Sequence, residues 1–177
     1  MNIGVFCGSA TGRNSVYADA ARELGFLLAQ HHHTLIYGGG NIGLMGILAD
    51  AVMNRGGRVI GVIPSFLFDK EVGHSGITQL EIVGSMHERK KRMTDLADAF
   101  IMMPGGWGTL DETAEILTWR QLGLITQPLS VLNINSFFDP LIVQLNRMVE
   151  EGFLKPAHLN SVIISNTPFD LLSKLRS

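Results

Sequence analysis

Three glycine-rich runs stand where short apolar stretches end, at residues 8–12, 38–43 and 104–109. Glycine allows backbone N–H groups to approach a phosphate closely, and a helix that follows adds the positive end of its dipole. Open parallel sheets bind ligands beyond the carboxyl ends of their strands. Tight turns explain single glycines well, but three runs at one edge favour a phosphorylated ligand.

The third run leads to Thr109 and Glu112, which suit two different roles. Thr109 can cap the helix that it opens, and a glutamate three residues later completes a capping box. The same spacing places the Glu112 carboxylate within one helical turn of the anion site, where a sugar attached to the phosphate would lie. The residues alone leave both roles open, and one carboxylate could serve both.

Arg89 differs from its charged neighbours Lys91 and Arg92, which we expect on a solvated helix face. Helical spacing places Arg89 on the apolar stripe of Met86 and Met93, so it should point toward protein. An inward guanidinium requires an anion, either a structural carboxylate or a phosphate. Beside the glycine runs, a ligand role is favoured.

The second run formally matches the dinucleotide-binding pattern G-x-G-x-x-G. A dinucleotide site also requires an acidic residue about 20 positions later, at the end of the next strand. The end of that strand reads Val62-Ile63-Pro64-Ser65, and the first acid after it is Asp69. An NAD-dependent oxidoreductase is therefore the less favoured alternative, and a nucleotide sensor without catalysis is another. A Walker A loop is excluded because no Gly-Lys-Ser/Thr follows these glycines.

These residues require a scaffold that brings strand ends together. Short β-branched runs alternate with longer amphipathic stretches, and the strands are too apolar for a solvated face. This pattern predicts an α/β fold with a doubly wound, mostly parallel sheet covered by helices on both faces. The predicted strands are residues 3–7, 34–37, 58–63, 80–83, 99–103, 129–132 and 162–165, and the predicted helices are 16–30, 44–54, 87–97, 110–122, 137–151 and 169–175. Residues 65–76 form the longest irregular segment, a candidate active-site loop.

Composition narrows the class of protein. A chain of 177 residues predicts a single domain spanning residues 1–177. The net charge of −2 carries no long basic run, so we expect a small-molecule ligand and no nucleic acid. The first residues show neither a basic leader nor a spanning apolar stretch, which favours a cytoplasmic protein without a membrane partner.

Apolar residues exceed what one chain can bury easily. They make up 46% of the sequence while charged residues make up 17%, so some apolar surface should be covered by a partner. Trp119 and Leu122 widen the apolar face of their predicted helix beyond one core stripe. We therefore expect a homo-oligomer.

Several residues that could do chemistry have simpler explanations. The run at residues 31–33 places histidines at a helix end, where exposed side chains are favoured over a metal site. Cys7 has no cysteine companion and suits a packed thiol. Trp107 could stack on a base or cover the helix start, and both roles stay open. We expect neither a metal nor a cofactor.

The motifs together resemble the LONELY GUY family of cytokinin riboside 5′-monophosphate phosphoribohydrolases, proteins often mislabelled lysine decarboxylases. The resemblance runs from the first strand to Phe153 and covers nearly the whole chain. The decarboxylase label lacks physical support, because no lysine sits in a recognisable pyridoxal Schiff-base setting. The motifs that carry it are Tyr37-Gly38-Gly39-Gly40 with Gly43-Leu44-Met45-Gly46, Met86-His87 with Arg89-Lys90, and Pro104-Gly105-Gly106-Trp107-Gly108-Thr109 with Glu112.

The resemblance implies a Rossmann-like fold, a homodimer with sites close to the subunit interface, and AMP-like substrates cleaved to a free base and ribose 5-phosphate. It implies that Arg89 and Glu112 are the catalytic pair. The substrate-binding residues expected beside that pair are Ser9, Gly39, Gly40, Glu71, Met86, Lys90, Gly105, Gly106, Trp107, Gly108, Thr109 and Thr118. The loop that contains Ser9 departs from the family's serine-rich form at Ala10-Thr11.

Overall fold

The computed structural model describes residues 1–68 and 72–175, and the structural statements below concern these residues. They form a seven-stranded sheet with strand order β4-β3-β2-β1-β5-β6-β7, in which the strand pairs are parallel. The predicted parallel α/β architecture is confirmed. The strands are β1 (Asn2–Phe6), β2 (Thr34–Tyr37), β3 (Arg58–Pro64), β4 (Gln79–Val83), β5 (Ala99–Met102), β6 (Leu129–Leu132) and β7 (Ile163–Ser165).

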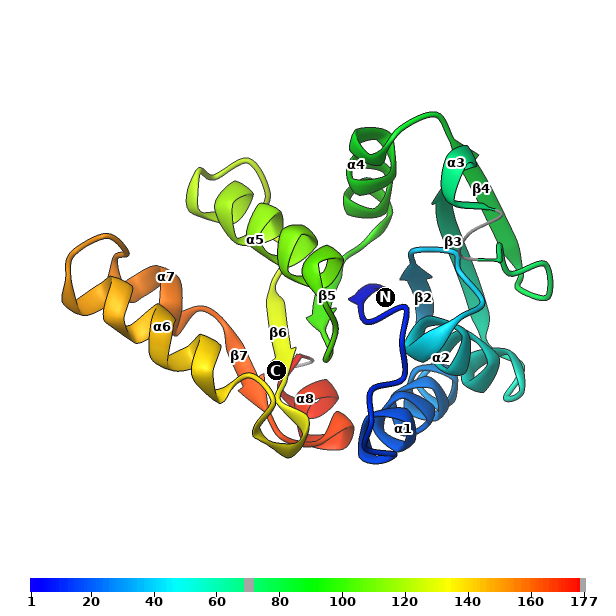
Figure 1. Ribbon diagram of the computed structural model, residues 1–177, viewed down its shortest axis with the longest axis horizontal. Helices are drawn as coiled ribbons and strands as arrows, with labels where there is room; N and C mark the ends of the chain where they lie inside the picture. Colours follow the sequence, from blue (N-terminus) through cyan, green and yellow to red (C-terminus); the bar gives the residue numbers. More distant parts are fainter. Residues whose placement is uncertain (69–71, 176–177) are drawn as a thin grey trace.

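Helices cover both faces of the sheet (Figure 1). One buried apolar cluster joins the sheet to α1, α2 and α8, and a second cluster joins its other face to α4, α5 and α6. The helices are α1 (Val16–Gln30), α2 (Gly43–Met53), α3 (Ser65–Phe68), α4 (Met86–Leu96), α5 (Trp107–Gln121), α6 (Asp139–Glu150), α7 (Pro156–Asn160) and α8 (Pro168–Leu175), with a 3₁₀ turn at η1 (Ile134–Ser136).

The burial pattern explains why these stretches fold as they do. Strands β5 and β6 are buried along their whole length, as expected for strands covered on both faces. In α1 the fully buried residues Ala21, Leu24 and Leu28 recur every three or four positions and therefore line one side of the helix. The apolar periodicity thus specifies both the element type and the face that packs.

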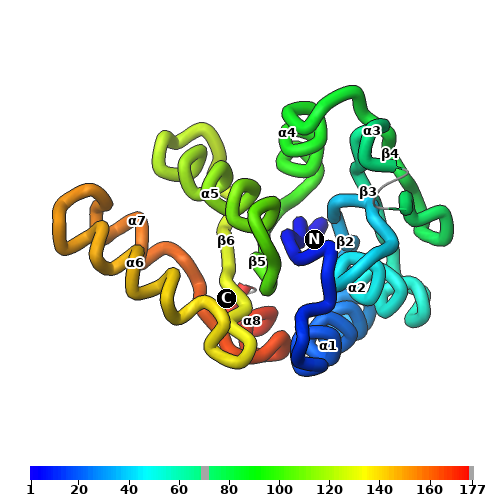
Figure 2. The backbone as a smooth tube through the Cα atoms, in the orientation of Figure 1, coloured from blue at the N-terminus to red at the C-terminus, as the bar shows by residue number. Residues whose placement is uncertain are grey.

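The direction of strand order reverses at β1. Strands β2 to β4 extend to one side of β1 and strands β5 to β7 to the other, which Figure 2 shows as separate blue-to-green and green-to-red halves of the chain. The loops after β1 and β5 therefore meet at a topological switch point, where such sheets bind ligands. The N–H of Gly8 donates to the carbonyl oxygen of Pro104 at 3.0 Å and joins these two loops.

Two expectations about elements were wrong. Residues 65–76 are not wholly irregular, because they begin with the short helix α3. Helix α6 starts at Asp139 and not at Phe137, since Asn135 and Ser136 adopt left-handed backbone angles with φ of 52° and 56°. These angles produce the 3₁₀ turn η1 and end any continuous helical path.

The histidine run differs from expectation in one member. His32 is exposed and His31 is half-buried, but His33 is only 8% exposed and its Nδ1 lies 3.4 Å from the N-terminal nitrogen of Met1. It directly precedes β2, where the strand enters the core. Among the described residues, no helix has the length and apolar content needed to cross a membrane.

Candidate active site

A cavity of about 140 Å³ lies at the carboxyl edge of the sheet, next to the switch point. The loops after β1 and β2, the first turn of α4 and the start of α5 form its walls. The sequence-predicted site residues that line it are Ser9, Met86, Arg89, Gly106, Trp107, Gly108, Thr109 and Glu112. The glycine runs and the two predicted catalytic side chains therefore meet in one place.

Arg89 points into the protein from α4 and is 6% exposed, as its position on the apolar stripe predicts. Its Nη2 donates to the carbonyl oxygen of Gly38 at 3.2 Å. The same nitrogen lies 4.0 Å from Oε1 of Glu112. A side chain at Gly38 would collide with the guanidinium, so only glycine allows this close approach. The loop after β2 thus holds the arginine through its backbone.

Glu112 is 8% exposed and lies inside α5, not at its start. The predicted capping box was wrong, because α5 begins at Trp107 with Gly106 as its N-cap residue and without a side-chain cap. Thr109 is therefore already within the first turn, and Glu112 lies in the second. Since the capping role does not account for Glu112, its buried carboxylate faces the cavity and Arg89 instead.

The start of α5 suits an anion. An α-helix leaves its first backbone N–H groups without partners inside the helix, and the helix dipole adds positive potential there. A side chain added at Gly106 or Gly108 would meet no atom within 4 Å, so the space beside this turn is open. Gly105, in contrast, packs against Thr109 and the backbone of Gly8, which fixes the loop.

Lys90 lies beside the cavity but turns toward α5. Its Nζ is 3.2 Å from Asp111 Oδ2 and 3.3 Å from Glu115 Oε2. Burial lowers the pKa of Lys90, but the hydrogen bonds that it donates to the carboxylates of Asp111 and Glu115, together with their negative charge, raise it by more, so the pKa lies above its usual value. A protonated, paired ammonium is a poor nucleophile for a Schiff base. This lysine has the environment of an ion pair that ties α4 to α5.

The other predicted residues lie around the cavity or away from it. Gly39 and Gly40 belong to the loop that carries the Gly38 carbonyl. Thr118 is exposed, donates to the carbonyl oxygen of Ala114 at 2.7 Å, and lines a different, larger cavity. Glu71 lies outside the described residues.

Cys7 lines the cavity at the end of β1 and is buried. Burial raises the pKa of its thiol, and the negative charge of Glu112 raises it further. The thiol is therefore protonated at neutral pH, and a nucleophilic role is not available to it. The expected packed thiol is what the structure has.

Five lining residues were not among the predicted contacts, namely Val5, Cys7, Gly8, Gly38 and Met45. Gly38 and Met45 stand in the family motifs after β2, so those motifs carry the signal. Val5 faces the cavity from within β1, and its sequence position gives no sign of this. Among the described residues, no three His, Cys, Asp or Glu side chains are grouped closely enough to hold a metal ion.

An open parallel sheet, with glycine loops at its switch point and a buried arginine–glutamate pair beside the start of a helix, defines an α/β protein with a candidate anion-binding edge. Residues 45–175 match the family described as possible lysine decarboxylase. The molybdenum cofactor binding protein of Rippkaea orientalis has the same fold, with a TM-score of 0.72 at 22% identity over 99% of this chain and 96% of that one.

Closer relatives give the family. The cytokinin riboside 5′-monophosphate phosphoribohydrolase LOG of Oryza sativa subsp. japonica is 45% identical over 173 residues, which cover 98% of this chain and 72% of that protein. The cytokinin riboside 5′-monophosphate phosphoribohydrolase LOG1 of Arabidopsis thaliana is 42% identical over 98% of this chain and 81% of its own length. The chain belongs to this family, that of the LONELY GUY proteins. The resemblance expected from the motifs is confirmed.

Proposed function

We propose that this chain hydrolyses the N-glycosidic bond of adenosine 5′-monophosphate or its N6-modified forms, releasing the free base and ribose 5-phosphate. Membership of a family whose curated relatives bear this activity supports the proposal. The observation that carries it is the buried pair of Arg89 and Glu112, with Nη2 and Oε1 4.0 Å apart beside the glycine-rich start of α5.

The phosphate would bind at the first turn of α5. The N–H groups of this turn and its dipole attract an anion, and Gly106 and Gly108 leave room for it. Anchoring the phosphate there allows binding energy to position the attached ribose over the cavity. Thr109 packs against Gly105 and would hold the loop in shape.

Glu112 would act on the ribose. Breaking the bond from the anomeric carbon to the base develops positive charge on the sugar ring, as in other glycoside hydrolyses. A buried carboxylate next to that carbon stabilises the charge and orients the attacking water. The water oxygen bonds to the anomeric carbon, and the base leaves with the bonding electron pair and takes up a proton.

Arg89 would bind the substrate and favour departure of the base through its positive charge. Its hydrogen bond to the Gly38 carbonyl fixes the guanidinium before substrate arrives, so little reorganisation is needed during the reaction. Lys90 would support the site by holding α4 against α5, in addition to the substrate contact that the family motif implies.

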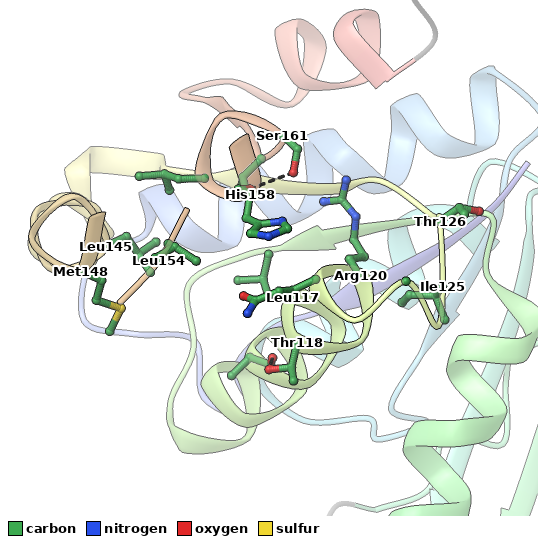
Figure 3. Close-up of a pocket in the computed structure, with 15 residues that line it drawn as sticks. Leu117, Thr118, Arg120, Ile125, Thr126, Leu145, Met148, Leu154, His158 and Ser161 are labelled. Atoms are coloured by element: carbon green, nitrogen blue, oxygen red, sulfur yellow. Dashed lines mark hydrogen bonds between the residues drawn. The ribbon is translucent and has the colours of Figure 1, made fainter. Parts of the chain in front are cut away.

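We further propose that two copies pair through a groove between α5, α6 and α7. This groove encloses about 600 Å³ and is lined by Leu117, Leu145, Met148 and Leu154 (Figure 3). Leu124, between the lining residues Gly123 and Ile125 in the sequence, is 67% exposed. The low charge content of the chain supports a second copy as the occupant. Thr118 lies in this groove (Figure 3). A site close to the interface would account for the substrate contact that the family resemblance assigns to Thr118.

The remaining expectations complete the proposal. Residues 1–177 act as a single nucleotide-binding domain in the cytoplasm. Its partners are a small nucleotide and a second copy of the chain, and it binds neither nucleic acid nor a membrane. The net charge of −2 and the absence of a broad basic field from the sequence support this.

The decisive experiment combines a substrate panel with one conservative variant. Nucleoside 5′-monophosphates, N6-prenylated AMP included, are incubated with the protein and the free base is measured by chromatography. Glu112→Gln keeps the shape of the side chain, so AMP binding measured by calorimetry should persist while turnover falls roughly 100-fold or more. Glu150→Gln on α6, an exposed glutamate paired with Arg147, serves as the control and should hydrolyse normally.

Two results would count against this assignment. Near-normal turnover by Glu112→Gln would remove this carboxylate from the chemistry. Tight AMP binding by the wild-type protein without release of any base over hours would point to a nucleotide sensor instead.

A further inference from the structure

The segment after α3 is tied to the glycine loop after β2. The N–H of His74 donates to the carbonyl oxygen of Gly39 at 2.9 Å, and an antiparallel bridge joins Gly40 to Gly73. The two loops therefore lie against each other as one unit at the carboxyl edge of the sheet. The hydrolytic mechanism proposed above makes no use of the loop that carries Gly73 and His74, which we call the outer loop.

The side chain of His74 fastens this unit to α2. It is 6% exposed, and its Nε2 lies 3.1 Å from Oδ1 of Asp50. Its Nδ1 accepts a hydrogen bond from the N–H of Gly76 at 3.2 Å. Because a backbone N–H can only donate, Nδ1 must be unprotonated, and Nε2 must carry the proton that it donates to Asp50. We call this pair of hydrogen bonds the His74 latch.

The backbone beside the latch is strained. Val72 has a φ of 47°, a left-handed conformation that β-branched residues rarely adopt. Its carbonyl oxygen accepts from the N–H of Asn41 in the glycine loop at 2.9 Å. Such a conformation persists only where surrounding contacts impose it, and it occurs most often at functional sites. The latch and the loop pairing supply those contacts here.

On its other side, the glycine loop holds Arg89. The carbonyl oxygen of Gly38 accepts from Nη2 of Arg89 at 3.2 Å, and Gly38 is the residue directly before Gly39, which the outer loop binds. A displacement of the loop would therefore move the group that orients the guanidinium relative to Glu112. A shift of about 1 Å in such a contact can reduce an enzyme's rate by up to roughly 100-fold.

We propose that His74 is a positioning residue for Arg89. Its latch to Asp50 fixes the glycine loop after β2, and that loop presents the Gly38 carbonyl that orients the guanidinium toward Glu112. The inference builds on the hydrolase function proposed above. It assigns a role to a buried histidine that is not among the residues lining the cavity.

A double-mutant cycle tests the route through Arg89. His74→Ala alone should lower kcat/KM for AMP roughly tenfold, because the loop loses its anchor. In an Arg89→Lys background the same change should have little further effect, since the guanidinium that the loop orients is gone. A loss of equal size in both backgrounds would overturn the proposal, because a merely structural role gives additive effects. Unchanged kinetics of His74→Ala would overturn it as well.

Two variants separate the latch from general destabilisation. His74→Gln keeps a donor at the reach of Nε2 and should recover most of the lost kcat/KM. His33→Ala removes a histidine of similar burial, 8% exposed, at the opposite edge of the sheet. It should lower the melting temperature without changing kcat/KM. If His33→Ala reduces kcat/KM as much as His74→Ala, the proposed route through Arg89 is wrong.

The cycle remains informative if a variant or the proposed function fails. Asp50 has a side chain that is 59% exposed, so Asp50→Ala opens the latch from the surface and replaces His74→Ala if that variant does not fold. If the wild-type protein releases no base, the hydrolase proposal fails by itself. The cycle is then measured as affinity for ribose 5-phosphate by calorimetry, where additive losses would still overturn the latch.

Discussion

At the scale of residues, the site is a buried pair of opposite charges with backbone support. Nη2 of Arg89 lies 4.0 Å from Oε1 of Glu112 and donates to the Gly38 carbonyl, while its Nη1 donates to Sδ of Met86 at 3.8 Å. Both side chains are at least nine-tenths buried, so both charges are held away from water. Such a pair is costly to desolvate and strongly destabilised when one member is removed.

Arg89→Ala should therefore impair stability, binding and rate together. Loss of the cation beside the buried Glu112 carboxylate costs on the order of 3–5 kcal/mol. We expect a lower melting temperature in calorimetry and a fall in kcat/KM for AMP of roughly 100-fold. Arg92→Ala is the matched control on the same helix, since Arg92 makes an exposed pair with Glu81. If Arg89→Ala kept the wild-type kinetics, Arg89 would serve only as the structural ion-pair partner of Glu112.

At the scale of elements, the site depends on how closely α4 approaches the loop after β2. Helix α4 begins with a side-chain cap, in which Ser85 Oγ accepts from the N–H of Glu88 at 3.2 Å. This cap fixes where the helix starts and therefore where Arg89 points. The missing side chain at Gly38 then allows the guanidinium to reach the loop.

Gly38→Ala should push the guanidinium away from the loop while the sheet stays intact. An added Cβ would meet Arg89, whose long side chain can yield, so we expect a fall in kcat/KM of roughly tenfold or more at a modest stability cost. Gly56→Ala provides the contrast. Gly56 has a φ of 70° with open space around it, so its variant should lose about 1 kcal/mol of stability, seen in denaturant unfolding, and keep full activity. If Gly38→Ala kept full activity while Gly56→Ala lost activity, the close approach of Arg89 to the loop after β2 would not matter for the reaction.

The sequence alone predicted the elements better than their ends. Strands β2 and β6 and helix α1 have the predicted bounds, because apolar periodicity decides them. The predicted start of α5 was wrong. The N-cap residue is Gly106, which has no capping side chain, whereas Thr109 is a typical N-cap residue and was therefore predicted as the cap. Helical spacing was enough to predict that Arg89 points inward. The role of the Gly38 carbonyl, in contrast, depends on a contact between distant segments, which no local sequence pattern encodes.

At the scale of the whole molecule, the proposed dimer makes a clear prediction. Met148→Asp and Leu124→Asp place a charge in or beside the α5–α6–α7 groove, where it would be buried only in a pair of copies. We expect both variants to be monomeric in sedimentation experiments. Phe169→Asp changes a residue on α8 that is 64% exposed, and it should remain a dimer. A monomeric wild-type protein, or dimers of all three variants, would contradict this interface.

The central place of β1 has a consequence for folding. This strand pairs with β2, close in sequence, and with β5, where Ile3 lies opposite Ala99. Beside this pairing, the N–H of Asn2 donates to Oδ2 of Asp98, 96 positions later. Non-local parallel pairing is slow, because a long stretch of chain must be closed before the contact stabilises it. Arg89 and Glu112 flank β5 in the chain, whereas Gly38 follows β2. Competence to bind nucleotide should therefore arise late in folding, after most of the helical structure has formed.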